Sequence, residues 1–129
     1  NNTNNFKNLI MKNPNISANE FYNDFIGTET YYKYLLGLLL TDGVKTVSQK
    51  ENCFWFLDCI ASYQLEKICG KEEFQVWKIQ RIRDTKFKLS ATNGNNKVLI
   101  TQDIEYSDFF FNELTIWKEN NVLLLPSEH

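Results

Sequence analysis

The chain has 129 residues, of which 43% are hydrophobic, 15% aromatic and 23% charged, and its formal net charge is −2. This length supports one domain with a real core, and the slightly acidic balance argues against a general nucleic-acid-binding protein, which is usually basic. No apolar run reaches the roughly 18 residues of a transmembrane helix, and the start of the chain lacks the apolar core of a signal peptide.

We therefore expect a soluble, cytoplasmic protein that has no membrane partner. Residues 1–129 are predicted to form a single domain. The polar residues 1–16 are predicted to form a loosely ordered extension at its N-terminus.

The three cysteines stand at positions 53, 59 and 69. An odd count without a close pair predicts free structural thiols in a reducing compartment rather than disulfides. The one histidine is the last residue, His129, so a structural zinc site is not expected. The chain also lacks a P-loop, a dinucleotide fingerprint, a nucleophile elbow and a His-Glu-x-x-His helix. We expect no cofactor, no bound metal and no catalytic residue.

A capping-box pattern marks the first clear helix start. Ser17 is followed three residues later by Glu20, so the side chain of each residue can accept a backbone N–H of the first turn. An apolar stripe follows, and Gly27 stands where a C-terminal cap is common. A shorter helix is also predicted over residues 6–11.

The apolar run at residues 35–40 fits either a buried strand or a helical segment, because so short a run has no decisive periodicity. Asp42-Gly43 is a turn signal that closes the run. Residues 44–50 then predict a short helix. The longest helix is predicted over residues 53–68, with Gly70 near its end.

One face of this central helix is predicted to lie in the core. Leu57, Ile60 and Ala61 fall on it at helical spacing, and we expect them to pack on the sheet near Trp77 or the aromatic run 109–111.

Two polar positions of the same helix are candidates for other roles. Gln64 is either a glutamine at the core margin or, together with Tyr63, part of a pocket. Asp58 lies on the opposite face, one turn before Ser62. We expect Asp58 to anchor a polar network with Ser62 or with the turn at residues 41–43.

The second half of the chain has strand composition and strong turn signals. The segments expected to form strands are 74–83, 86–91, 98–106, 114–117 and 122–125. Helices followed by strands predict an α+β domain, with N-terminal helices packed on a C-terminal antiparallel sheet of four to five strands.

Several segments together resemble the bacterial and phage domain-of-unknown-function family numbered 6876. The segments are Gly27-Thr28-Glu29, Thr41-Asp42-Gly43-Val44-Lys45, Asp58 with Ile60-Ala61-Ser62-Tyr63-Gln64, Phe74-Gln75-Val76-Trp77-Lys78, Tyr106-Ser107-Asp108-Phe109 and Leu123-Leu124-Leu125-Pro126-Ser127-Glu128. The resemblance covers about residues 27–129. The family has no assigned activity, so the resemblance implies a small protein of bacterial chromosomes and mobile elements and supplies no catalytic residues.

The leading interpretation is a small non-enzymatic interaction protein from a bacterial mobile element or phage. It would bind, and could inhibit, a macromolecular partner such as a host defence complex. The partner would be a protein or ribonucleoprotein complex, and homo-oligomers remain open. Aromatic residues and arginines are common interface anchors. The candidate binding residues are Asp58, Tyr63, Gln64, Trp77, Lys78, Arg81, Arg83 and Lys88.

Two alternatives remain open. Residues 78–88 carry five basic residues and one acidic residue, with the aromatic residues Trp77 and Phe87 near the two ends, an arrangement that can bind single-stranded nucleic acid by charge and stacking. Alternatively, Glu29, Asp42 and Asp58 converge around a metal ion in a small hydrolase or nuclease.

Overall fold

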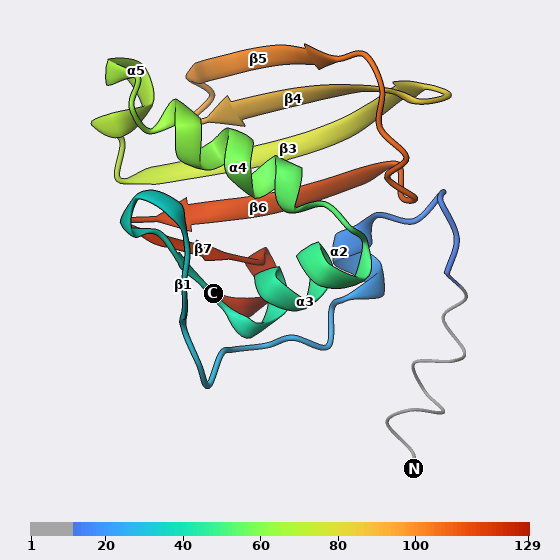
Figure 1. The fold of residues 1–129 in the computed structure, drawn as a ribbon, viewed down its shortest axis with the longest axis horizontal. Coiled ribbons are helices and arrows are strands. Elements are labelled where there is room, and N and C mark those ends of the chain that lie inside the picture. Colours follow the sequence, from blue (N-terminus) through green and yellow to red (C-terminus); the bar gives the residue numbers. More distant parts are fainter. Residues whose placement is uncertain (1–11) are drawn as a thin grey trace.

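Two helices lie against one face of a seven-stranded sheet in the computed structural model, which describes residues 12–129 (Figure 1). The α-helices are α2 (Ala18–Phe21), α3 (Asp42–Lys50), α4 (Phe54–Tyr63) and α5 (Lys67–Gly70). The strands are β1 (Tyr32–Lys33), β2 (Leu39–Leu40), β3 (Phe74–Arg83), β4 (Lys86–Thr92), β5 (Val98–Ile104), β6 (Glu113–Glu119) and β7 (Val122–Leu124). Two 3₁₀ turns are η1 (Leu35–Gly37) and η2 (Pro126–Glu128).

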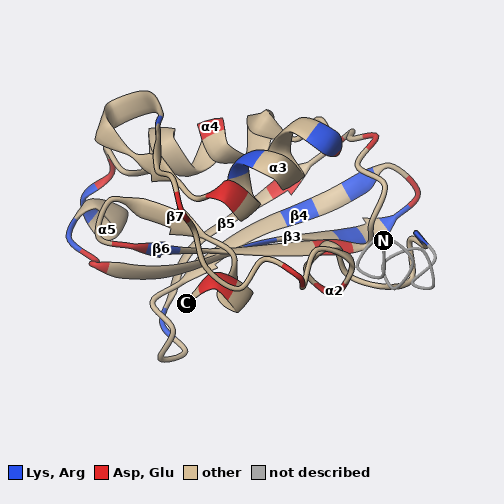
Figure 2. Ribbon diagram, turned by 90° about the horizontal axis from the view of Figure 1, so that it is seen from below, with Lys and Arg blue, Asp and Glu red and all other residues tan. Residues whose placement is uncertain are grey.

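The strand order is β1-β2-β7-β6-β3-β4-β5, and β2 and β7 form its one parallel pair. Seen edge-on, α3 and α4 lie on the same side of the strands (Figure 2). None of the helices within residues 12–129 combines the length and apolar character needed to cross a bilayer. The helix expected at residues 6–11 lies outside the described residues, as does most of the extension expected over residues 1–16.

The α+β class is confirmed, but the expected sheet of four to five strands is wrong. The five C-terminal strands form as expected, and two strands of two residues each join them from the region before α3. In β2, Leu39 and Leu40 pair with Val122 and Leu123. The undecided run at residues 35–40 therefore holds both a 3₁₀ turn and a strand, and the helices do not simply precede the sheet.

The starts of α2 and α3 follow local capping chemistry. Ser17 accepts a hydrogen bond from the Glu20 N–H at 3.1 Å, so the predicted N-cap of α2 is confirmed. Gly27 is not its end, because α2 stops after one turn at the C-cap Tyr22. Thr41 caps α3 by accepting from the Val44 N–H at 3.3 Å. The helix therefore begins two residues earlier than expected.

The long helix expected over residues 53–68 is divided in two. The first part, α4, ends at Tyr63 with Gln64 as its C-cap, and α5 starts at Lys67. The predicted core face of α4 is confirmed, because Leu57 and Ile60 have no exposed surface and belong to one cluster with Trp77. That packing fixes α4 across the sheet, with its outer face turned to solvent.

Candidate interaction surface

A buried amide pair explains the break after α4. The side-chain amides of Gln64 and Gln75 bind each other reciprocally at 2.9 and 3.0 Å. Gln75, which has no exposed surface, also donates to the Cys69 and Glu72 carbonyls and accepts from the Trp77 indole at 2.8 Å. Gln64 is thus part of a structural hydrogen-bond network, as the core-margin interpretation predicts, and Trp77 is fully buried. Tyr63 is half-buried, and its hydroxyl donates to the Gln102 side chain.

A second closed network joins three segments that carry the family resemblance. The carboxylate of Glu128 accepts from the Thr41 hydroxyl at 2.6 Å and from the Gly43 N–H at 3.0 Å. Thr28 in turn accepts from the Asp42 N–H at 2.8 Å. A carboxylate at a helix N-terminus pairs with free N–H groups and the positive end of the helix dipole. These motif residues therefore hold the start of α3 to residues 126–128.

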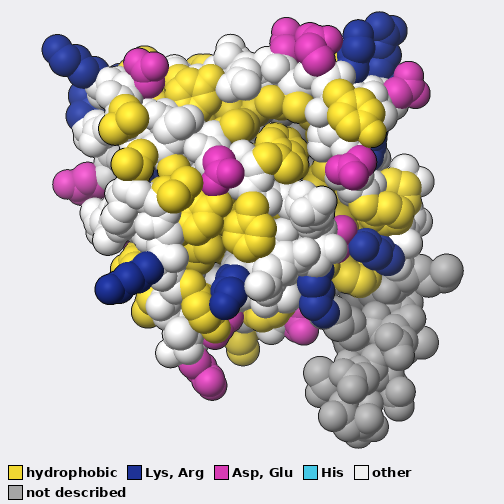
Figure 3. All heavy atoms as spheres, in the orientation of Figure 1, with side chains coloured by type: hydrophobic (Ala, Val, Ile, Leu, Met, Phe, Trp, Pro, Cys, Tyr) yellow, Lys and Arg dark blue, Asp and Glu magenta, His cyan; other side chains and the backbone are white. Residues whose placement is uncertain are grey.

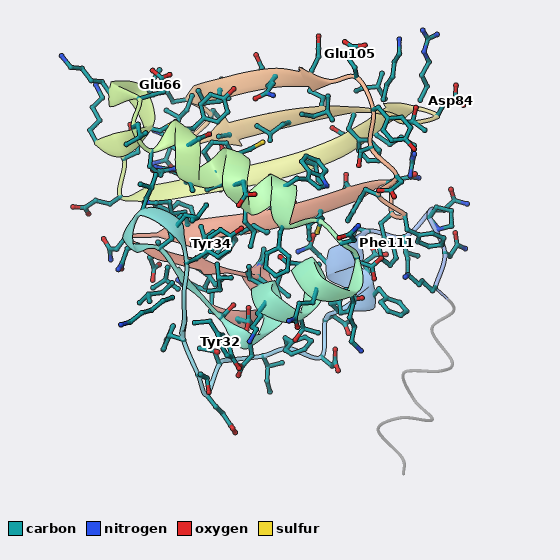
Figure 4. The ribbon with its side chains drawn as sticks, viewed as in Figure 1. Tyr32, Tyr34, Glu66, Asp84, Glu105 and Phe111 are labelled. Atoms are coloured by element: carbon teal, nitrogen blue, oxygen red, sulfur yellow. The ribbon has the colours of Figure 1, made fainter. Side chains whose placement is uncertain are left out.

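Asp58 lies on the exposed face of α4 and binds neither of its expected partners. Ser62 donates instead to the Cys59 carbonyl at 2.9 Å, and the Asp58 carboxylate accepts from the Tyr34 hydroxyl. The Tyr34 ring stacks on Phe54, with the ring centroids 6.0 Å apart and the planes at 19°. Partial burial, followed by the hydrogen bond to Asp58, raises the pKa of Tyr34 well above its ordinary value. Tyr34 therefore anchors the segment after β1 to α4 (Figure 4).

Tyr34 also fixes the η1 turn, which exposes two leucines. The Tyr34 N–H donates to the Leu38 carbonyl at 2.8 Å and closes the turn, and the Leu38 side chain is buried. Leu35 is 53% exposed and Leu36 is 60% exposed. Leu36 also has left-handed backbone angles, φ 55° and ψ 35°. A left-handed conformation costs a residue with a side chain about 1–2 kcal/mol.

We call Tyr34, Leu35, Leu36, Phe54 and Asp58 the leucine-turn surface. In Figure 1 the η1 turn lies beside α4, at the end of the molecule that holds α5. Figure 3 shows hydrophobic side chains gathered over α4 and this turn, with acidic side chains among them. Only Asp58 of this surface was among the predicted binding residues. The tyrosine-rich segment running into Leu-Leu-Gly was the signal that could have located the rest.

The basic segment 78–88 does not form one binding surface. Trp77 and Phe87 are buried, so neither ring is open to stack on a base. Lys78 and Lys88 lie on the sheet face opposite Trp77, because strand residues alternate between faces. Figure 2 shows the basic positions spaced along β3 and β4. Lys88 and Arg83 are exposed, and any role of theirs in binding stays a prediction.

Arg81 is engaged by the protein's own backbone. Its guanidinium donates to the Asn112 side chain at 3.0 Å and to the Phe109 carbonyl at 2.8 Å, and it lies 4.6 Å from the Phe87 ring centroid. It also donates to the Asp84 carbonyl. Arg81 thus holds the loop between β5 and β6 on the sheet and has few donors left for a phosphate.

Two of the three carboxylates considered as metal ligands, those of Asp42 and Asp58, accept hydrogen bonds from other residues. Asp42 accepts from the Glu29 N–H at 2.9 Å, a bond that holds the pKa of Asp42 below its ordinary value. Asp58 accepts from Tyr34. Across residues 12–129, no three His, Cys, Asp or Glu side chains form a group that could hold a metal ion. The metal-site alternative therefore has no geometric support in this part of the chain.

Removing either partner of the Tyr34–Asp58 bond should lower the free energy of unfolding by about 1 kcal/mol, the usual worth of such a bond. We expect similar losses for Tyr34→Phe and Asp58→Ala, and coupling between them in a double-mutant cycle measured by urea denaturation. The pKa of Tyr34 is raised on folding, so this contribution is present below about pH 10 and is lost as the pH rises above that value. Ser62→Ala is the control and should change stability by under about 0.5 kcal/mol. Additive effects in the cycle would contradict the network.

Comparison with known protein families gives a match over most of the chain. A family model described as a family of unknown function, DUF6876, matches residues 16–129. No curated protein and no solved structure matches the chain. The match covers nearly the whole chain, so the protein belongs to the DUF6876 family of unknown function.

Proposed function

We propose that this protein is a non-enzymatic binding module that engages a protein partner through the leucine-turn surface. The observation that supports this is a pair of exposed leucines, Leu35 and Leu36, held on a left-handed turn. Left-handed strain in a bulky residue persists only when surrounding contacts impose it, and such strain concentrates at functional positions. Here the contacts are the Tyr34 bonds to Leu38 and Asp58.

The chemistry of the surface favours a protein over a nucleic acid. Its centre is aliphatic and aromatic, and its charged member is the carboxylate of Asp58. A phosphate backbone would be repelled by that carboxylate and would gain nothing from the leucines. A protein with an apolar pocket bordered by basic side chains would complement both features.

The broader setting of the proposal is a bacterial cell. The protein would act in the cytoplasm, as a product of a phage or other mobile element, by occupying a site on a host defence or regulatory complex. The three cysteines are free and not paired with each other, which suits a reducing compartment. Binding without catalysis suits the lack of a recognised catalytic motif.

Substituting the two leucines should remove partner binding without unfolding the protein. The double variant Leu35→Ser/Leu36→Gly loses the exposed apolar side chains, and glycine adopts the left-handed backbone without strain. We expect its free energy of unfolding to stay within about 1 kcal/mol of the parent value, because strain relief offsets the greater freedom of the unfolded chain. Affinity capture from bacterial lysate with quantitative mass spectrometry measures the binding.

The matched control is Ile82→Ser, which removes an isoleucine that is 59% exposed on β3. Proteins retained by the parent and by Ile82→Ser but lost by the double variant would support the proposal. Equal retention by all three forms would overturn it, and so would equal loss by both variants.

A further inference from the structure

The sheet ends in an open strand. β5 (Val98–Ile104) has β4 as its neighbour on one side, and no other strand within residues 12–129 pairs with it. An edge strand directs the N–H and C=O groups of alternate residues outward, where they can pair with another chain. Figure 1 shows β5 along the upper border of the sheet.

β5 has few of the features that usually protect an edge strand. Its sequence, Val-Leu-Ile-Thr-Gln-Asp-Ile, contains no lysine and no proline, and Asp103 is its one charged residue. Its register shift against β4 lies at the start of the strand and leaves residues 100–104 regular. Natural sheets usually protect an edge of this length with charges, prolines or central bulges.

We propose that two copies of this chain pair through β5, antiparallel, about a two-fold axis at Thr101. Thr101 is the midpoint of the strand and is exposed. An antiparallel pair of identical edges is self-complementary and closes as a dimer. The opposite edge of the sheet is β1, which has two residues, so it offers too little backbone for the pairing to continue into a filament.

The charges of β5 are compatible with this arrangement. With Thr101 on the axis, Asp103 of one copy lies opposite position 99 of the other, which falls in the register shift of β5 against β4. The two Asp103 carboxylates are then four strand positions apart, or about 13 Å at the usual rise, and repel little across solvent. The two Thr101 side chains face each other, and threonine pairs are favourable across strands.

This dimer goes beyond the proposed function and does not compete with it. β2, which follows the leucine turn, lies near the β1 edge of the sheet, and β5 is the opposite edge. Dimer formation through β5 would leave both leucine-turn surfaces open, so each dimer would present two binding sites.

A charge placed on the two-fold axis tests the pairing. We expect the parent chain to sediment as a dimer at concentrations of about 10 μM and above, a range typical of small specific interfaces. Thr101→Lys alone and Thr101→Glu alone should be monomers, because like charges would face each other across the axis. An equimolar mixture of the two variants should recover the dimer as a heterodimer.

Thr30→Lys is the control, because Thr30 is exposed and precedes β1 at the far edge of the sheet. It should sediment like the parent, and far-UV circular dichroism should show that every variant is folded. A monomeric parent at these concentrations would overturn the proposal. A dimer that survives both single substitutions, or one that is not recovered on mixing, would also overturn it.

Discussion

Replacing Gln75 by Glu should lower the free energy of unfolding by about 1–3 kcal/mol at pH 7, because a buried carboxylate cannot replace the donors of the amide, and the buried Lys118, opposite Gln75 on β6, offsets only part of the cost of burying the charge. Gln75 has no exposed surface, and its NH₂ group donates to Gln64 and to the carbonyls of Cys69 and Glu72. A carboxylate at this position can still accept from the Trp77 indole. The carboxylate has no N–H group to donate to the Cys69 and Glu72 carbonyls. Those two hydrogen bonds would be lost, and the carboxylate oxygens would repel the carbonyl oxygens.

The loss of unfolding free energy in Gln75→Glu should grow as the pH rises. Burial raises the pKa of the introduced carboxyl above the ordinary value of about 4.3. The folded state therefore keeps the proton at pH values where the unfolded state has lost it. Stability relative to the parent is retained below about pH 4 and is lost as the pH rises toward the folded-state pKa. The protonated acid can donate to one carbonyl, as the glutamine does.

Gln80→Glu provides the matched control for this experiment. Gln80 lies on the same strand but is exposed, so the same chemical change should alter stability by under about 0.5 kcal/mol. Urea denaturation of the parent and both variants between pH 4 and pH 8 gives the comparison. If the two variants lost equal stability at every pH, the Gln64–Gln75 network would not hold α4 and β3 together.

The sequence predicted those parts of the fold that depend on local chemistry or strong periodicity. The cap at Ser17 needs only its own first turn, and the core face of α4 needs only helical spacing. The strand β1 was missed, and the run that contains β2 could not be assigned to strand or helix, because segments this short show no period. β2 joins the sheet by pairing with β7, which lies more than 80 positions later in the chain, and β1 pairs with β2.

The candidate surface was harder to predict, because distant partners decide which polar groups remain free. Gln64 could not be assigned between core margin and pocket until Gln75 was in place. Asp58 was expected to bind Ser62 at helical spacing, but Tyr34 reaches it from 24 residues away. From the sequence, Arg81 was predicted to be a binding residue, but its guanidinium donates to carbonyls of the loop between β5 and β6. Alternation along β3 alone does place Trp77 and Lys78 on opposite faces, which already weakens the stacking hypothesis.

Leu57→Ala should cost about 2–5 kcal/mol of unfolding free energy, because a fully buried leucine is replaced by a cavity. That is a large share of the 5–15 kcal/mol by which domains of this size are usually stable. Leu57 lies on the face of α4 that packs on the sheet, and its cluster includes Ile60 and Trp77. Ile60→Ala should behave in the same way.

Leu65→Ala makes the identical chemical change two residues after α4, where the side chain is 78% exposed. It should alter stability by under about 0.5 kcal/mol. Guanidinium chloride denaturation of the three variants separates burial from residue type, because only the environment of the leucine differs between Leu57 and Leu65. Similar losses at Leu57 and Leu65 would mean that α4 does not pack on the sheet through Leu57. The leucine-turn surface would then have lost the rigid helix on which Tyr34 is anchored.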